Sequence, residues 1–226
     1  MKILYIDTAL ENASTGLIRD GLIVSFRSNS LQSDHAAWIH TAIKELMQEA
    51  GELPETLDAI AVTSGPGSYT GLRVGMATAK GLCYALGKPL ITENVLKLTA
   101  IAALDYHLSQ NTSAKDPLVC AMIDARRMEV FTALYTKDLE ESLAPAALVL
   151  DERSFSAELS KNTIIFCGNG SNKWKNLCNH PNAIFYSISH SPENFARVAA
   201  EKLMGREFTD LAYSEPDYFK GFYSAK

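Results

Sequence analysis

Residues Ala61 to Ile91 read AVTSGPGSYTGLRVGMATAKGLCYALGKPLI and are the most informative segment for the fold of this chain. It starts in a short apolar strand, passes through a glycine-rich loop over 65–71, and continues as a helix over 71–86. One face of this helix carries only small residues, which allow another backbone to approach closely. A strand over 90–92 follows, so the stretch predicts a strand–loop–helix–strand unit of an α/β fold.

Upstream of this stretch, the chain is expected to form a hairpin followed by a helix. The helix is expected over 36–50, because apolar residues recur there at the three-and-four spacing of one helical face. Ser33 or Asp34 can cap its start, and Gly51 can end it. Asp20-Gly21 provides the hairpin turn. The strands before the helix are expected over 2–7, 15–19 and 22–27.

Downstream, a third helix is expected over 94–109, and the polar segment 109–115 marks a boundary between two lobes, 1–110 and 111–226. The second lobe repeats the strand-rich opening of the first in looser form. A final helix over 191–205 opens with a serine cap and a first-turn proline, and it is expected to pack back on the first lobe. Strands of the second lobe are expected over 118–124, 128–135, next to Val149, and over 163–167 and 184–188.

The composition is that of a folded chain with an acidic balance. The 226 residues include 21 Lys and Arg against 26 Asp and Glu, which gives a formal net charge of -5, and 47% of them are hydrophobic. This excludes global disorder. It also excludes a surface that is cationic as a whole, so any nucleic acid has to be held by a local patch or by a partner.

Membrane insertion and secretion are not expected. No apolar run reaches the roughly 18 residues that a membrane-spanning helix needs. Asp7 interrupts the N-terminal apolar stretch too early for a signal peptide. The four cysteines are scattered without a Cys-x-x-Cys pair and predict buried, reduced thiols. The chain is therefore expected in the cytoplasm.

Two interpretations of the glycine-rich loop stay open. Free backbone N–H groups at the start of the following helix favour an anion, which predicts a nucleotide or phosphate site. Alternatively, the loop is only a tight turn that requires glycine. Asp7, at the end of the first strand, either helps to hold a metal–nucleotide complex or caps the next turn. The residues of this candidate site are Asp7, Thr8, Gly65, Gly67, Ser68, Thr70 and Gly71.

No catalytic or metal-binding constellation is recognisable in the sequence. The loop lacks the lysine of a Walker motif, and its glycine spacing differs from the dinucleotide fingerprint. The five histidines form no ligand pair. Arg126-Arg127 joins two strands and either meets an acidic partner or a phosphate, or is solvated. The apolar stripe of helix 36–50, with Trp38 on its shoulder, is either a core face or a surface that buries against another chain.

Several segments of the sequence resemble those of a known family. The run Ala61–Ile91, together with Ile6-Asp7-Thr8, His35 and Ile123-Asp124-Ala125-Arg126, strongly resembles the TsaB (YeaZ) family of bacterial tRNA threonylcarbamoyladenosine biosynthesis proteins. The resemblance covers residues 1 to about 135 well. It implies an actin-like ATPase fold of the ASKHA and RNase H-like kind, with two similar lobes that each contain a mixed sheet flanked by helices.

The resemblance also implies a noncatalytic subunit. The catalytic sister, TsaD, carries a metal-binding His-x-x-x-His, and the corresponding positions here are Val95 and Thr99. Valine cannot ligate a metal and threonine hardly does, so no metal and no cofactor of its own are expected for this subunit. ATP or ADP is expected only as a ligand of the complex. The alternative is an active enzyme, either an actin-fold ATPase or phosphotransferase or a glycoprotease-like peptidase.

As implied by the resemblance, the chain binds a TsaD-type subunit through the first two helices and works with a TsaE-type ATPase. The complex forms threonylcarbamoyladenosine (t6A) beside the anticodon of tRNAs that read codons starting with A. The chain forms a homodimer when alone and meets tRNA indirectly, through the complex. The residues expected to contact the partner are His35, Ile39, Ile43, Leu46, Met47, Arg73 and Gly75.

Overall fold

A computed structural model describes residues 1–30, 35–110 and 116–220, with the backbone alone for His35. The chain divides into two compact units. Unit 1 comprises Met1–Val95 and Ser191–Asp217, and unit 2 comprises Leu96–His190 and Tyr218–Lys226. The division therefore falls after Val95 rather than at the expected 110/111. The reason is that helix 95–109 packs with the strands of unit 2, where the Cys167 thiol lies 3.8 Å from the Thr99 carbonyl oxygen.

Unit 1 contains a five-stranded mixed sheet. Its strand order is β3-β2-β1-β4-β5, in which β1 to β3 form an antiparallel meander and β4 and β5 run parallel to β1. Burial is continuous from Ile3 to Asp7 in β1 and along the whole of β4, which shows that both faces of the sheet are covered. The strands are β1 (Lys2–Asp7), β2 (Ala13–Arg19), β3 (Leu22–Asn29), β4 (Ala59–Gly65) and β5 (Leu90–Asn94).

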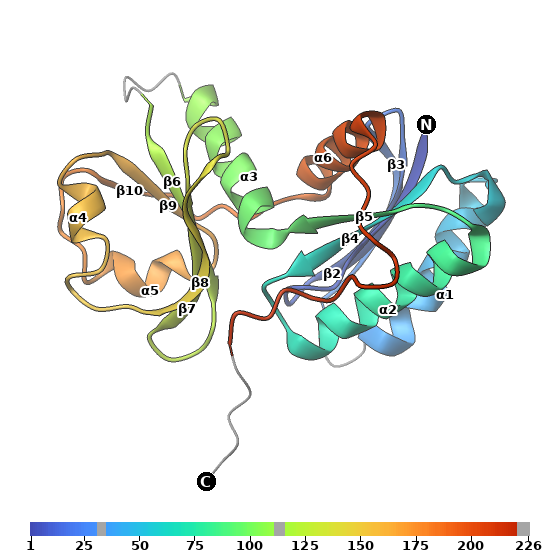
Figure 1. Ribbon diagram of the computed structural model, residues 1–226, viewed down its shortest axis with the longest axis horizontal. Helices are drawn as coiled ribbons and strands as arrows, with labels where there is room; N and C mark the ends of the chain where they lie inside the picture. Colours follow the sequence, from blue (N-terminus) through green and yellow to red (C-terminus); the bar gives the residue numbers. More distant parts are fainter. Residues whose placement is uncertain (31–34, 111–115, 221–226) are drawn as a thin grey trace, which may run out of the picture. The chain divides into compact units, whose positions relative to one another are not determined.

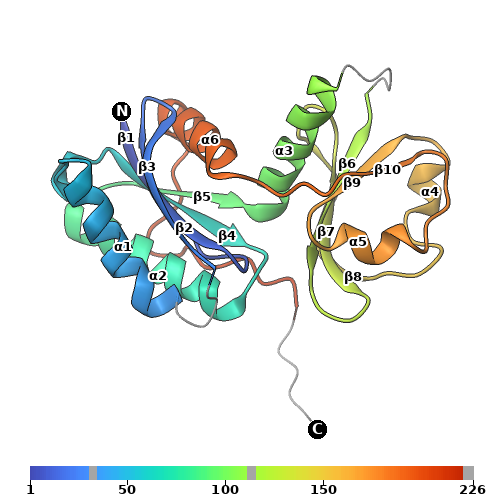
Figure 2. The same cartoon turned by 180° about the vertical axis from the view of Figure 1, so that it is seen from behind.

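Helices cover the two faces of this sheet differently. Helices α1 (His35–Glu49) and α2 (Tyr69–Leu86) lie side by side on one face, and α6 (Pro192–Gly205) lies on the other (Figures 1 and 2). The ring of Tyr5 meets that of Phe195 of α6 edge-on at 5.7 Å. Its neighbours along the strand, Leu4 and Ile6, belong to the core beneath α1 and α2. This alternation follows from the two-residue period of a strand.

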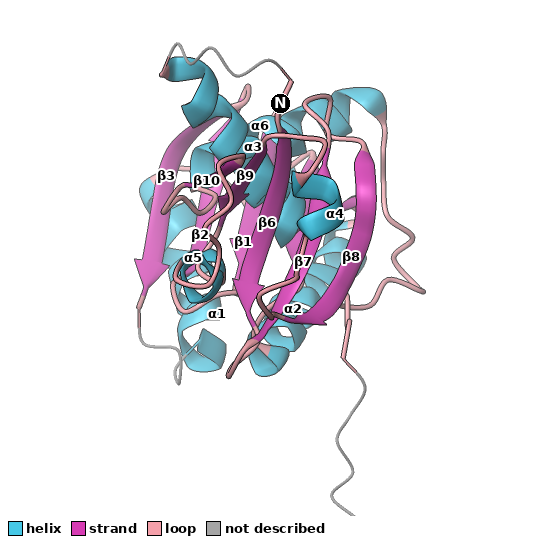
Figure 3. Ribbon diagram, turned by 90° about the vertical axis from the view of Figure 1, so that its left-hand side faces the viewer, coloured by secondary structure: helices cyan, strands magenta, loops and turns pink. Residues whose placement is uncertain are grey.

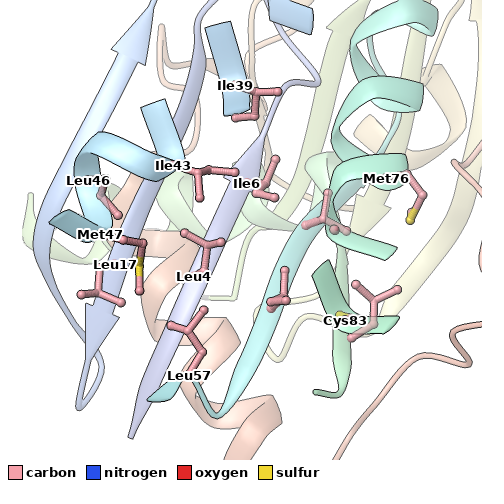
Figure 4. Packing of buried hydrophobic residues seen from close by; sticks show 14 residues of the cluster. Leu4, Ile6, Leu17, Ile39, Ile43, Leu46, Met47, Leu57, Met76 and Cys83 are labelled. Atoms are coloured by element: carbon pink, nitrogen blue, oxygen red, sulfur yellow. The ribbon is translucent and has the colours of Figure 1, made fainter. Parts of the chain in front are cut away.

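The core beneath α1 and α2 joins residues from both helices and from four strands (Figure 4). α2 begins at Tyr69, two residues earlier than expected, because Ser68 caps it: the Ser68 hydroxyl accepts a hydrogen bond from the Gly71 amide at 3.3 Å. The expected caps of α1, Ser33 and Asp34, lie outside the described residues. The core is formed by Leu4, Ile6, Leu17, Ile39, Ile43, Leu46, Met47, Leu57, Ile60, Val62, Met76, Ala79, Cys83 and Leu90.

Unit 2 repeats the sheet of unit 1. Its order, β10-β9-β6-β7-β8, has the same antiparallel meander followed by two parallel strands (Figure 3). The predicted repetition of the first lobe by the second is thereby confirmed. The elements are α3 (Val95–Ser109), β6 (Leu118–Asp124), β7 (Glu129–Tyr135), β8 (Glu141–Val149), α4 (Ser156–Leu159), β9 (Ile164–Cys167), α5 (Ser171–Lys175) and β10 (Ala183–Phe185).

Short elements account for the expectations that were wrong. β10 ends at Phe185 instead of continuing to 188, and β8 extends back from Val149 to Glu141. The helices α4 and α5, with 4 and 5 residues, and the 3-10 turn Pro54–Thr56 were not predicted, because fewer than two turns give no readable periodicity. No helix within the described ranges is long and apolar enough to cross a membrane.

Candidate functional site

The glycine-rich loop packs tightly against the turn that follows β1. A Cβ atom added to Gly67 would collide with the Ala9 carbonyl oxygen, and one added to Gly71 would collide with the Thr8 carbonyl oxygen. The Ser68 amide donates a hydrogen bond to the Ala9 carbonyl oxygen at 2.7 Å. The glycines at 67 and 71 are thus required by the close approach of two backbones. This geometry supports the interpretation of the loop as a tight turn.

Asp7 and Thr8 hold the same junction from the side of β1. Asp7 is buried, and its Oδ1 accepts hydrogen bonds from the Ala9 amide at 3.1 Å and from the Thr63 hydroxyl at 2.9 Å. The Thr8 hydroxyl donates to the Gly71 carbonyl oxygen at 2.7 Å. The structure therefore brings Asp7, Thr8 and the glycine loop together, and the contacts of Asp7 include the capping of the following turn.

Asp217, which sequence reasoning did not assign to this site, completes it. The Ser64 hydroxyl donates to Asp217 Oδ2 at 2.6 Å and the Asn94 amide group donates to the same oxygen at 3.1 Å. The Asp217 amide donates to the Ser64 carbonyl oxygen at 2.7 Å. Burial raises the pKa of this carboxyl, although both side-chain hydrogen bonds lower it. Asp217 lies 153 positions from Ser64 in the sequence, so no local pattern could assign it to this site.

The apolar residues expected to contact a partner lie inside unit 1. Ile39 and Leu46 have no exposed surface, and Ile43 and Met47 are 9% and 4% exposed. Figure 4 shows their side chains directed at the strands beneath α1. The apolar stripe of α1 is a core face, so Ile39 and Leu46 cannot contact a partner while unit 1 is folded, whereas Ile43 and Met47 also line a groove. The physical reason is that the meander β1–β3 needs an apolar cover, which α1 supplies.

Of the other expected contact residues, one is buried and one is exposed. Gly75 faces its own strands, since an added Cβ would collide with the Thr8 hydroxyl oxygen and approach Val62. The small-residue face of α2 is therefore used within unit 1, and the expectation that it receives a partner is wrong. Arg73 is exposed, and its guanidinium stacks on the Tyr69 ring at 4.4 Å. The side chain of His35 lies outside the described residues.

The outer faces of the two helices form a surface of different composition. We define the α1–α2 surface by the exposed residues His40, Lys44, Gln48, Arg73, Ala77 and Tyr84. Tyr84 is 85% exposed. A groove of about 370 Å³ is lined by residues of α1, of the segment that follows it and of α2: His40, Ile43, Lys44, Met47, Gln48, Glu52, Leu53, Pro54 and Leu82.

Two of the cysteines, and the two positions that correspond to metal-binding histidines in TsaD, are buried in the protein interior. Burial raises the pKa of the Cys83 and Cys120 thiols to about 12, so both are protonated at neutral pH. Val95 and Thr99 are fully buried on α3. Among residues 1–30, 35–110 and 116–220, no three His, Cys, Asp or Glu side chains gather where they could hold a metal ion.

Comparison with known proteins identifies the family. The family model described as TsaD, tRNA N6-adenosine threonylcarbamoyltransferase, matches residues 29–214. The TsaB tRNA threonylcarbamoyladenosine biosynthesis protein of Bacillus subtilis is 26% identical over 225 residues, which are 97% of this chain and 94% of that protein.

Solved structures agree with this relationship. YeaZ from Pseudomonas aeruginosa is 25% identical, with a TM-score of 0.73, over 96% of this chain and 100% of that chain. A putative N-acetylmannosamine kinase from Listeria monocytogenes is 13% identical with a TM-score of 0.52, and the match covers 92% of this chain and 100% of that chain. This likeness is one of fold alone. The expected α/β fold, with two similar lobes that each contain a mixed sheet flanked by helices, is confirmed. The chain belongs to the TsaD family and, within it, to the TsaB (YeaZ) group.

Proposed function

We propose that this chain is a noncatalytic subunit in the biosynthesis of threonylcarbamoyladenosine in tRNA, and that it binds a TsaD-type catalytic subunit. The observation that carries the proposal is the α1–α2 surface. The inner faces of both helices are used by the core, and their outer faces remain exposed and side by side. The names of the TsaB relative and of the TsaD family model support the assignment to this pathway.

In this proposal, the chain supports the transfer of the threonylcarbamoyl group to the adenosine 3′ of the anticodon in tRNAs that read codons starting with A. A TsaE-type ATPase acts with it, and ATP or ADP binds in the complex. When the TsaD-type subunit is absent, a second copy of the chain occupies the α1–α2 surface. The complex acts in the cytoplasm.

Two features of the structure support a noncatalytic role. Val95 and Thr99, which stand where the catalytic sister has metal-binding histidines, are buried hydrophobic and hydroxyl side chains. The backbone of the glycine loop is also used internally, because the Ser68 amide donates to Ala9 and the Ser68 hydroxyl accepts from Gly71. Both features fit a protein whose family fold is used for docking.

The composition of the α1–α2 surface suits a protein partner. Tyrosine and arginine are enriched in interfaces, and Arg73 and Tyr84 of this surface lie along one side of α2. Helices of 15 and 18 residues are long enough to contribute half of an interface of about 1,600 Å². Arg73 and Tyr84 therefore replace the buried residues of α1 as the contacts that we expect to matter most.

Co-purification with the TsaD-type subunit tests this assignment. We expect Arg73→Glu/Tyr84→Ala to weaken the complex by at least about tenfold, as removal of central interface residues does. The matched control is Arg206→Glu/Met204→Ala, which alters two exposed residues at the end of α6, on the other face of the sheet. If the first variant binds as well as the control, the surface is assigned wrongly.

The competing function is an active enzyme. It predicts turnover of ATP or of a peptide by the isolated chain, abolished by Asp7→Asn. Turnover at an enzymatic rate would overturn the noncatalytic assignment, whereas restoration of tRNA modification only after addition of the other subunits would support it.

A further inference from the structure

The turn between β6 and β7 in unit 2 has an unusual backbone. Arg126 and Arg127 have φ values of 71° and 49°, both in the left-handed region. This region favours glycine, because an L side chain there crowds the following carbonyl oxygen. Two consecutive arginines in it, both exposed, form a costly turn at a place where glycine would be tolerated. The cost indicates that the side chains themselves have a use.

Hydrogen bonds fix the backbone of this turn. Asp124 Oδ1 accepts from the Arg126 amide at 2.6 Å, and the Ala125 amide donates to the Glu129 carbonyl oxygen at 3.1 Å. The Glu129 amide donates to the Arg126 carbonyl oxygen, also at 3.1 Å. The two arginines are therefore attached to an ordered backbone at the tip of a hairpin, which lowers the entropy that a ligand would have to remove.

The carboxylates next to the turn already have cationic partners. Lys173 Nζ lies 2.6 Å from Asp124 Oδ1, and Lys220 forms an ion pair with Glu129. Within the described part of the chain, no ion pair or side-chain hydrogen bond reaches the guanidinium groups of Arg126 and Arg127. The turn therefore has four cationic side chains, the two arginines and the two lysines, and two carboxylates. The local charge is positive, although the net charge of the chain is -5.

We propose that the β6–β7 turn binds phosphate groups of RNA. The planar guanidinium donates paired hydrogen bonds that match phosphate oxygens, and it remains charged at every physiological pH. We choose RNA over an acidic protein because the inference rests on the proposed function, which brings the chain to a complex that acts on tRNA. Because the chain is acidic overall, contact with RNA requires a local basic patch of this kind.

The test measures tRNA binding by the complex of this chain with the TsaD-type and TsaE-type subunits at several salt concentrations. Arg126→Gly/Arg127→Gly removes both guanidinium groups and relieves the backbone. We expect about tenfold weaker tRNA binding at low salt, and a slope of log affinity against log salt that is smaller by about 1 to 2. We expect the unfolding temperature to stay the same or rise, since glycine favours these φ values.

Arg126→Glu/Arg127→Glu should weaken tRNA binding further, and it has a matched control. Arg153→Glu/Lys161→Glu makes the same charge change at two exposed positions elsewhere in unit 2 and should leave the salt slope unchanged. Wild-type affinity and slope for the glycine variant would overturn the inference. Loss of co-purification with the TsaD-type subunit, without a change in the slope, would also overturn it and would indicate an acidic protein partner.

The failure of the proposed function gives a different result. Cells depleted of the chain that retain normal threonylcarbamoyladenosine in their tRNA would refute the proposed function. If depletion removes the modified nucleoside and the glycine variant binds tRNA normally, only the role of Arg126 and Arg127 is refuted.

Discussion

The two units share one sheet topology but cover it differently. In unit 1, the meander β1–β3 is followed by α1, with 15 residues, and β4 and β5 are joined by α2, with 18 residues. At the equivalent places, unit 2 has α4 and α5, with 4 and 5 residues. The same arrangement of strands therefore supports long helices in one unit and single helical turns in the other.

This difference shows how each unit fills its core. In unit 1, aliphatic side chains of long amphipathic helices cover the sheet and leave a continuous outer surface on α1 and α2. In unit 2, the short helices supply too little cover, and the aromatic rings of Phe155, Phe166, Trp174 and Phe185 fill the space instead. A surface suited to docking is thus available where the helices are long.

The largest effect is expected from Trp174→Ala. Trp174 is 1% exposed, its ring centroid lies 4.8 Å from that of Phe166, and its indole N–H donates to the Asp151 carbonyl oxygen at 2.9 Å. We expect a loss of about 3–5 kcal/mol in the free energy of unfolding, measured by denaturant titration. Leu108→Ala, at a side chain 73% exposed in the same unit, should cost less than about 0.5 kcal/mol. Similar effects of the two substitutions would contradict an aromatic core.

A smaller effect is expected where α2 approaches the end of β1. Gly71→Ala places a Cβ against the Thr8 carbonyl oxygen and should destabilise unit 1 by about 1–3 kcal/mol. Gly81→Ala, on the same helix, meets no atom within 4 Å and should stabilise by about 0.5–1 kcal/mol. The measurement is the free energy of unfolding of both variants. If both substitutions destabilise the protein, or both stabilise it, the close contact at Gly71 does not explain the difference expected between the two positions.

The next effect is a dependence of the stability of unit 1 on pH. Glu52 lies 2.6 Å from Lys2 Nζ and 2.7 Å from Arg19 Nη2, and chiefly the hydrogen bond from Lys2 lowers the pKa of Glu52 to about 2. Since the folded pKa is depressed, the stability that this group provides is present above its ordinary value of 4.5 and is lost as the pH falls through about 2. Glu52→Gln should flatten the stability profile in that range. If the free energy of unfolding of the variant falls with decreasing pH as steeply as that of the wild type, the Glu52 cluster does not contribute to the pH dependence.

The smallest effect is expected from Asp217→Asn, and it has the opposite sign. Burial raises the pKa of Asp217 above 3.8, so its contribution to stability is complete below that value and is lost as the pH rises through the folded pKa. The asparagine carbonyl oxygen can still accept from Ser64 and Asn94. We therefore expect the variant to be at least as stable as the wild type at neutral pH and to lack this pH dependence. A marked loss of stability at neutral pH would show that the ionised carboxylate is needed.

Elements with long or chemically specific patterns could be predicted from the amino-acid sequence. The three-and-four spacing over α1, the serine cap and proline that open α6, and the glycine loop before α2 were readable because each depends on neighbours within a few residues. The family followed from the same local motif. The repeated order of strands in the two units was also visible, since strand patterns recur along the chain.

The sequence did not show which helix faces are buried or which distant residues are in contact, because both depend on how the elements pack. An apolar stripe looks the same whether it covers its own sheet or a partner, so the burial of Ile43 and Met47 required the packed meander of unit 1. Asp217 reaches Ser64 across 153 positions of sequence, and no local pattern encodes such a contact. The left-handed backbone of Arg126 and Arg127 could not be predicted for a related reason. Arginine rarely adopts this conformation, and here the hydrogen bonds of the folded hairpin hold it there.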